Sequence, residues 1–270
     1  RFIQIRGVGE RSQFVEPVNA SVAMLLDGID LTGLGAAATT WDIQQIEILR
    51  GPQGTLLGAN ALAGLISLNS TAADNSGLKL AIGAENNGGS RLAAAGGGEL
   101  TDNISGRVAI EQYRSDGAIK NTYLNRGDTQ RKDELTLRGG LAWQGTNQRV
   151  EANWHFFDVD NGYDAFSLDN TRQTLSDEPG RDTLQTHAGR LKWSSQGKVN
   201  LSAQFSVADT DTEYAYDEDW AYVGIAPALE YSSFDTYLRD RDMQSLEIRA
   251  DSDYDSWRWT VGGYLKHERE

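Results

Sequence analysis

From about residue 77 onward, apolar and polar side chains alternate along one segment of the chain after another. The alternation is clearest in residues 134–144, 148–157, 199–207 and 257–266, and it is weaker in 78–85, 90–97, 104–113, 184–195 and 243–251. Successive side chains of a β-strand point to opposite faces. The pattern therefore predicts about nine strands, each with one apolar and one polar face.

The lengths of these segments and of their connections indicate a membrane barrel. Most segments run for about 9–12 residues, whereas an average globular strand has about 5–6 and a tilted strand that crosses a bilayer has about 9–11. Long connections at 114–133, 159–183 and 209–242 alternate with short ones near 145–147, 196–197 and 252–255. Bacterial outer-membrane barrels have this asymmetry, with short periplasmic turns and long external loops.

The tryptophans provide an internal check on this topology. If the first strand rises from the periplasm, Trp143 and Trp193 lie near the ends of descending strands, and Trp257 and Trp259 near the start of an ascending one. All four are then expected at the periplasmic interface, where aromatic belts are common. The alternative is that they are ordinary core tryptophans.

The first 75 residues lack this regular alternation and are rich in glycine. The stretch Ile43–Leu68 begins as an apolar run, is interrupted by glycines and Pro52, and ends in the strand-like Leu65–Leu68. So many glycines in one stretch predict backbone packed closely against backbone. Upstream, Val22–Leu26 is a predicted strand that stops at the turn pair Asp27–Gly28. Residues 41–45 are predicted to form one helical turn, with Thr40 as its cap.

Three motifs in this part resemble one known family. The sequence RGPQGTLLGANALAGLISL, residues 50–68, resembles the last part of the plug domain of TonB-dependent outer-membrane receptors. FIQIRGVG at 2–9 and SVAMLLDGID at 21–30 resemble earlier plug motifs, in the same order. The resemblance covers about a quarter of the chain and assigns these plug-motif residues: Arg6, Gly7, Asp27, Gly28, Glu47, Arg50, Gly51, Pro52, Gly54, Gly58 and Gly64. It also implies that Glu47 and Arg50 tie the plug to the barrel wall.

The expected fold is therefore mainly β. Residues 1–75 are expected to form an α+β plug domain that lacks its N-terminal part, and residues 76–270 the first part of a transmembrane antiparallel β-barrel. The resemblance implies about 22 strands in a complete barrel. Because Arg1 lies inside a motif and Trp257–Glu270 is a strand with no successor, we expect an internal piece of a longer protein, without the N-terminal box that engages TonB.

The amino-acid composition limits which partners and sites the chain can have. The formal charge is −14, from 25 basic and 39 acidic residues, which argues against a nucleic-acid partner. The chain has no cysteine, so thiolate metal sites and cysteine nucleophiles are excluded. No run approaches the roughly 18 apolar residues of a membrane helix.

The sequence offers little support for an enzyme. His155, His187 and His267 lack metal-site spacing and are expected to face the lumen or an interface. Residues 51–54 lack the Gly-Lys-Ser/Thr of a phosphate loop, and no GxSxG motif occurs. We predict no enzyme, metal site or cofactor. Asp209, Asp211 and Glu213 have the spacing of a calcium loop but lack its glycine, so they are interpreted as a solvated loop, with cation binding as the alternative.

The best ligand-binding candidates lie in residues 209–242. This stretch contains ten acidic residues and two arginines, interleaved with aromatic residues. We expect an external loop whose aromatic side chains capture ligand, with Tyr214, Tyr216, Trp220 and Tyr222 as candidates. The alternative is that these aromatic residues only pack the loop against itself.

The resemblance implies active transport of a scarce nutrient across the bacterial outer membrane. Ligand would bind the external loops and the plug, and TonB, with ExbB and ExbD, would supply energy from the inner membrane. Ferric siderophore is the default substrate class; cobalamin, haem and oligosaccharides remain open. Two alternatives are a passive surface barrel, such as a porin or adhesin, and a soluble β-sandwich binding module.

Overall fold

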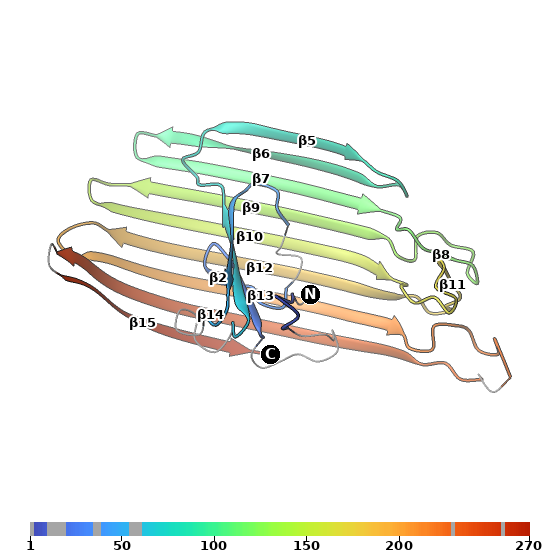
Figure 1. Ribbon diagram of the computed structural model, residues 1–270. Coiled ribbons are helices and arrows are strands. Elements are labelled where there is room, and N and C mark those ends of the chain that lie inside the picture. Colours follow the sequence, from blue (N-terminus) through green and yellow to red (C-terminus); the bar gives the residue numbers. More distant parts are fainter. Residues whose placement is uncertain (1–2, 10–19, 35–38, 54–60, 228–229, 255–256) are drawn as a thin grey trace.

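The computed structural model describes residues 3–9, 20–34, 39–53, 61–227, 230–254 and 257–270. Every helix or strand assigned in this part of the chain is a β-strand, and the strands form three sheets (Figure 1). No helix among the described residues combines the length and the apolar character needed to cross a bilayer.

Nine long strands form the large sheet, as the alternating pattern predicted. They are β5 (Gly77–Ala84), β6 (Ser90–Thr101), β7 (Ile104–Ser115), β9 (Lys132–Gln144), β10 (Gln148–Tyr163), β12 (Gly180–Ser195), β13 (Asn200–Asp217), β14 (Phe234–Tyr254) and β15 (Trp257–Arg269). Each strand pairs antiparallel with its predecessor, so the sheet is an up-and-down series of the kind found in barrels.

Several strands are longer than the apolar alternation predicted. The connection expected at 209–242 is shorter, because β13 continues to Asp217 and β14 already begins at Phe234. Antiparallel pairing depends on backbone hydrogen bonds and not on apolar side chains. The two strands therefore remain paired through their acidic residues, from Asp209↔Asp242 to Asp217↔Phe234.

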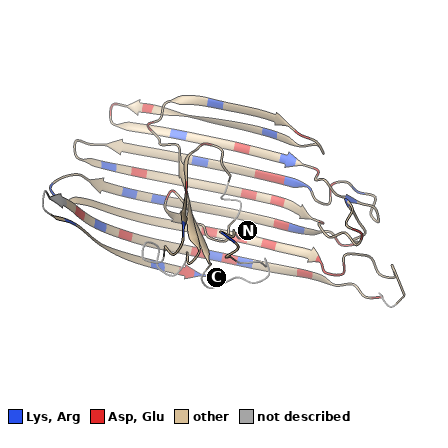
Figure 2. Cartoon of the chain, viewed as in Figure 1, with Lys and Arg blue, Asp and Glu red and all other residues tan. Residues whose placement is uncertain are grey.

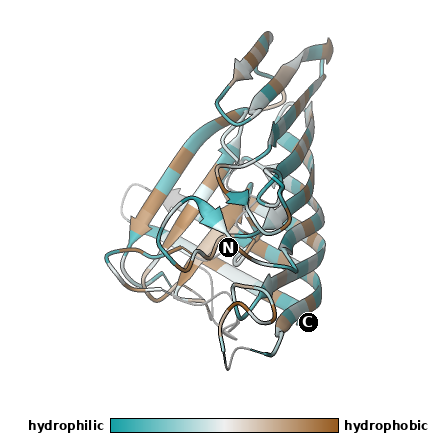
Figure 3. Cartoon of the chain, turned by 90° about the vertical axis from the view of Figure 1, so that its right-hand side faces the viewer, coloured by the Kyte–Doolittle hydropathy of each residue, from teal (hydrophilic) through white to brown (hydrophobic). Residues whose placement is uncertain are grey.

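The apolar rows lie on one face of the large sheet, which we call the outer face, and are exposed there. Leu80 is 69% exposed, Val108 68%, Leu141 55% and Val261 65%. Figure 3 shows the resulting alternation of hydrophobic and hydrophilic residues along the strands. The described residues supply no second sheet against this face, so the rows do not form the dry interior that a soluble sandwich requires.

A four-stranded sheet of the N-terminal part lies across the opposite, inner face of the large sheet (Figure 1). Its strands are β1 (Val22–Leu26), β2 (Ile29–Asp30), β3 (Ile43–Arg50) and β4 (Gly64–Ser70), in the order β2-β1-β4-β3. The strands predicted at 22–26 and 65–68 are confirmed. The helical turn predicted at 41–45 is wrong, because Asp42 has a left-handed backbone (φ 57°) and β3 begins at Ile43.

The main core lies between these two sheets. The N-terminal sheet and the segment that follows β2 supply Met24, Leu26, Ile29, Leu31, Leu34 and Leu68. The inner face of the large sheet supplies Phe157, Leu184, Ala188, Ala208 and Met243. The inner face of the large sheet therefore contributes to this core where the N-terminal part covers it.

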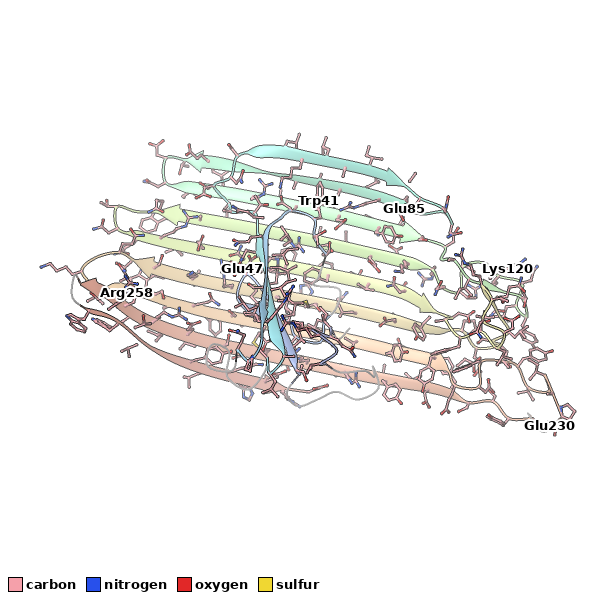
Figure 4. All side chains as sticks on the ribbon, in the orientation of Figure 1. Trp41, Glu47, Glu85, Lys120, Glu230 and Arg258 are labelled. Atoms are coloured by element: carbon pink, nitrogen blue, oxygen red, sulfur yellow. The ribbon has the colours of Figure 1, made fainter. Side chains whose placement is uncertain are left out.

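The long connections are gathered at one end of the large sheet. There, β8 (Lys120–Asn121) and β11 (Gln173–Thr174) pair in parallel and link two of these connections. Figure 4 places Lys120 and Glu230 at this end and Arg258 at the opposite end, where the short connections lie.

Candidate functional site

The Asp27–Gly28 turn is one centre of the contact between the two sheets. Both residues have a left-handed backbone, with φ of 51° and 79°, as a two-residue hairpin turn requires. Oδ1 of Asp27 accepts a hydrogen bond from the Ser70 amide (2.8 Å), and its Oδ2 lies 3.0 Å from Nε2 of His155 on β10. Burial alone would raise the pKa of Asp27, but His155, the Ser70 amide and Arg190 together lower it below the ordinary value.

Each of the seven long strands from β7 to β15 has a polar side chain that reaches the N-terminal part. We call them the docking row: Arg107 (β7), Arg138 (β9), His155 (β10), Arg190 (β12), Gln204 (β13), Arg241 (β14) and Lys266 (β15). Figure 2 shows basic positions on several neighbouring strands behind the N-terminal sheet. The two parts are thus joined by a polar contact from each of these strands, in addition to the shared apolar core.

At one end of the docking row, Arg107 forms a buried ion pair with Asp42. Its Nε and Nη2 each donate to the Asp42 carboxylate at 2.7 Å, and both side chains are 4% exposed. Lys79 of β5 donates to the same carboxylate at 3.1 Å. Burial alone would raise the pKa of Asp42, but the hydrogen bonds from Arg107 and Lys79 lower it.

The middle of the docking row mainly binds backbone carbonyl groups. Arg138 donates to the carbonyl oxygens of Trp41 and Thr39, the latter at 2.8 Å. Arg190 donates to the Asp27 carbonyl oxygen at 2.7 Å. Because carbonyl groups at turns have no strand partner, these arginines satisfy acceptors that would otherwise be buried unpaired.

At the other end, Lys266 binds Asp30 and Arg241 binds the backbone beside it. Lys266 Nζ lies 2.8 Å from the Asp30 carboxylate, and Arg241 donates to the Thr32 carbonyl oxygen at 2.6 Å. The pKa of Asp30 would be raised by burial, but the Lys266 charge and hydrogen bonds from Lys266 and Thr32 lower it. Three carboxylates of the N-terminal part, those of Asp27, Asp30 and Asp42, thus face basic side chains of the large sheet.

The plug-motif residues lie in several different parts of the N-terminal fold. Arg6 and Gly7 form a tight turn between Ile5 and Val8, and Gly51 and Pro52 follow β3. Gly64 fulfils the prediction of close backbone approach, since a Cβ there would lie 2.5 Å from the Leu49 carbonyl oxygen. Gly54 and Gly58 lie outside the described residues.

Glu47 and Arg50 do not take part in this interface as the structure describes it. Both lie on β3, which is an edge strand of the N-terminal sheet (Glu47 is labelled in Figure 4), and both are exposed. Glu47 accepts a hydrogen bond from Gln45 of the same strand at 2.7 Å. Within the described residues, no ion pair joins either residue to the nine strands, and their role as wall contacts stays a prediction.

All four tryptophans of the predicted belt lie at the end of the sheet with the short connections. Trp143 and Trp193 come just before the ends of β9 and β12, and Trp257 and Trp259 begin β15. Val150 pairs with both Trp143 and Trp193, which fixes these two at the same level of the sheet. This arrangement agrees with an aromatic belt at one membrane interface.

The four ligand candidates lie at the opposite end, in a cluster of aromatic rings. Tyr214 and Tyr216 belong to β13 and not to a loop, and Tyr214 is only 1% exposed. Trp220 stacks on Phe166 with ring centroids 4.7 Å apart, and Tyr222 stacks on Tyr123 at 4.4 Å. Trp220 is 39% exposed, so it remains accessible to a ligand, whereas Tyr214 supports its neighbours.

Asp209, Asp211 and Glu213 also lie on β13, so the loop predicted for them is wrong. They follow Val207 on the outer face, where the apolar row of this strand ends. Among the described residues, no group of three or more histidine or acidic side chains could hold a metal ion.

The sequence analysis did not predict the docking row, although it named Asp27, which contacts His155 of this row. His155 was expected to face the lumen, and it does point to the inner face, where it is fully buried. The available signal was the recurrence of a single basic residue on the polar face of neighbouring strands, as with Arg107, Arg138 and Arg190. Which carboxylate each would meet could not be read from strand patterns.

Comparison with known proteins agrees with this arrangement. Residues 1–65 match the family model "TonB-dependent Receptor Plug Domain". The vitamin B12 transporter BtuB of Vibrio vulnificus is 26% identical over 200 residues, which cover 70% of this chain and 31% of the transporter. The pesticin receptor of Yersinia enterocolitica is 36% identical over 66 residues, which cover 24% of this chain and 9% of the receptor.

Solved structures share the fold over nearly the whole chain. The ferric yersiniabactin uptake receptor FyuA from Yersinia pestis aligns with a TM-score of 0.74 at 18% identity, covering 93% of this chain and 40% of that receptor. The siderophore receptor PiuA from Acinetobacter baumannii aligns with a TM-score of 0.71 at 14% identity, covering 91% of this chain and 38% of that receptor. The chain therefore spans less than half the length of these proteins, which are receptors and transporters and not enzymes. The plug match, together with a nine-stranded partial barrel that holds the plug on its inner face, identifies the chain as part of a TonB-dependent receptor of the bacterial outer membrane.

Proposed function

We propose that the full-length receptor takes up a scarce nutrient across the outer membrane by TonB-dependent active transport, with a ferric siderophore as the first candidate. The observation that supports this most is the polar docking row. The ion pairs and hydrogen bonds of this row, unlike the apolar core beside them, can be broken at little net cost once water enters, since water replaces each broken contact. TonB, with ExbB and ExbD, would supply the energy.

The substrate class comes from the relatives and not from a ligand contact. FyuA is described as a ferric yersiniabactin uptake receptor and PiuA as a siderophore receptor, whereas BtuB is a vitamin B12 transporter. The four aromatic candidates, Tyr214, Tyr216, Trp220 and Tyr222, are proposed to form or support the external capture site. In the same proposal, Glu47 and Arg50 contact wall strands other than the nine described.

Uptake measured in two strains tests the proposal. The full-length receptor is expressed as the only relevant receptor in a tonB+ strain and in a tonB deletion strain, and accumulation of labelled ferric siderophores, cobalamin and haem is followed. We expect accumulation of one ligand class in the tonB+ strain and none above background in the deletion strain. Equal uptake in both strains would support the passive barrel instead, and uptake of cobalamin alone would overturn the siderophore assignment.

A further inference from the structure

A groove of about 710 Å³ crosses the outer face of the large sheet, on the side away from the plug. Its floor is formed largely by glycines of β6, β7 and β9, and its rim by larger apolar side chains. The outward-facing residues that line it are Gly96, Gly98, Leu100, Gly106, Val108, Gly139, Leu141, Ala152 and Trp154. Three charged or polar residues also border it. Arg107 and Asn153 are turned to the inner face, where they bind Asp42 and Arg190, and the exposed Glu99 lies next to Gly98 at the end of β6. We propose that this groove binds one acyl chain of a membrane phospholipid.

Two of the glycines are not explained by the fold. Gly96 and Gly139 are the two cross-strand neighbours of Val108. A Cβ at Gly96 would have its nearest contact at 3.6 Å from Leu78, and one at Gly139 at 4.0 Å from Trp154, which are ordinary van der Waals distances. Neither glycine has a positive φ. Because glycine weakens a strand, two glycines that neither packing nor backbone requires indicate that the empty space itself is used.

The position of the groove determines the kind of occupant. It lies among the exposed apolar rows of the outer face, and Leu141 on its rim is two residues from Trp143 of the tryptophan belt. The groove is therefore continuous with the surface that faces lipid, just inside one interface of the membrane. The side chains that it presents outward are apolar, which favours a hydrocarbon occupant over a polar ligand.

The concave shape of the groove favours a flexible acyl chain as its occupant over the flat surface of another protein. A gap left between protein and lipid costs the lining atoms their dispersion contacts, so the groove must be filled by something that follows its contour. An acyl chain can lie along the glycine floor between Val108 and the rim residues Leu100 and Trp154. Such a chain exchanges with bulk lipid more slowly than chains along the rest of the outer face.

Substitutions that fill the groove with larger side chains test the proposal. The full-length receptor is purified in mild detergent from its own membranes, and retained phospholipid is counted by native mass spectrometry for wild type, Gly96→Leu, Gly139→Leu and the double variant. We expect the double variant to retain about tenfold less phospholipid, since each added side chain occupies the space of several methylene groups. Gly263→Leu is the matched control, because Gly263 also lies on the outer face but outside the groove; it should retain as much lipid as wild type.

A second measurement separates binding from folding. Phosphatidylethanolamine with a spin label on its acyl chain, reconstituted with each receptor, should show an immobilised component that the two groove variants lose and the control keeps. Heat-modifiable gel mobility checks that every variant forms a barrel. Unchanged lipid retention in the groove variants, or absence of retained lipid in wild type, would overturn the proposal. A change of oligomeric state in the groove variants would overturn it in favour of a protein partner.

Discussion

At Asp42, one carboxylate of the plug meets two basic side chains of the wall. Arg107 and Asp42 are both nearly excluded from water, whereas Lys79 is 51% exposed and contributes less because solvent screens it. A buried pair of this kind is a weak source of net stability, but the loss of one partner leaves an uncompensated charge. Single residues of the docking row should therefore control how firmly the plug is held.

Asp42→Asn tests this at the residue scale. The substitution keeps the shape of the side chain but leaves Arg107 without its counter-charge, at a cost of about 3–5 kcal/mol. Amides of β3 and β4 in the full-length receptor should then exchange with deuterium roughly 100-fold faster. Asp74→Asn is the control, because Asp74 pairs with Arg149 at the surface, where a pair contributes about 0–1 kcal/mol. Equal exchange in both variants would show that Asp42 does not hold the plug.

At the scale of elements, the long connections are fastened to one another. Asn121 of β8 is fully buried and donates to Asp164 at 3.0 Å and to the Ser176 carbonyl oxygen at 2.8 Å. The Phe166–Trp220 and Tyr123–Tyr222 stacks attach the connection after β13 to the two before it. Trp220 has a left-handed backbone (φ 60°), and its amide donates to Asp217 at 3.1 Å. A bulky residue held in this conformation is a mark of functional sites.

Trp220→Ala tests the aromatic cluster as a capture site. Loss of the exposed indole should raise the half-saturating ligand concentration for uptake about tenfold, while the maximal rate changes little, because plug release does not involve Trp220. Trp257→Ala, at the opposite end of the sheet, should leave both quantities unchanged. Equal affinities for wild type and Trp220→Ala would favour the alternative that these rings only pack the loops together.

At the scale of the whole molecule, the charges of the docking row make plug attachment depend on pH. Asp27, Asp30 and Asp42 have pKa values lowered by their basic partners, against burial that would raise them. Each carboxyl group has a lower pKa when the plug is docked than when it is released, where the pKa is near 3.8. Such a group stabilises docking at pH values above 3.8. The stabilisation is lost as the pH falls through the lower pKa of the docked state. Attachment should therefore be constant at neutral and mildly acidic pH and should weaken only in strong acid.

Protease accessibility of the plug in the detergent-solubilised full-length receptor measures this dependence. We expect no change between about pH 7 and 5, and cleavage that increases as pH falls below about 3.8 toward the lower pKa values of the docked carboxylates. A variant with asparagine at positions 27, 30 and 42 should lack the transition. Loosening that begins between pH 7 and 5 would contradict the assignment and would direct attention to His155, which faces Asp27 and the neighbouring Arg138 and Arg190.

The strands were predictable because their signal is local. The period of two along the chain predicts that Leu201, Phe205 and Val207 lie on one face of a strand. The same pattern predicts the number of strands and the face that contacts lipid. The acidic ends of β13 and β14 were missed because pairing there depends on the partner strand and not on side-chain polarity. The turn at Trp41–Asp42 was missed because its left-handed residue is stabilised by Arg107, a residue 65 positions away.

The sequence by itself determined the plug motifs, the alternating strands, the tryptophan belt and the asymmetry of the connections, since each depends on neighbouring residues and on the solvent they face. Only the tertiary structure decided which basic side chains Asp27, Asp30 and Asp42 contact, and that aromatic residues of three connections stack together. It also decided that Gly96 and Gly139 lie on either side of Val108, which opens the groove. These features join residues far apart in the chain, and their geometry depends on sheet register and on how the plug lies against the wall.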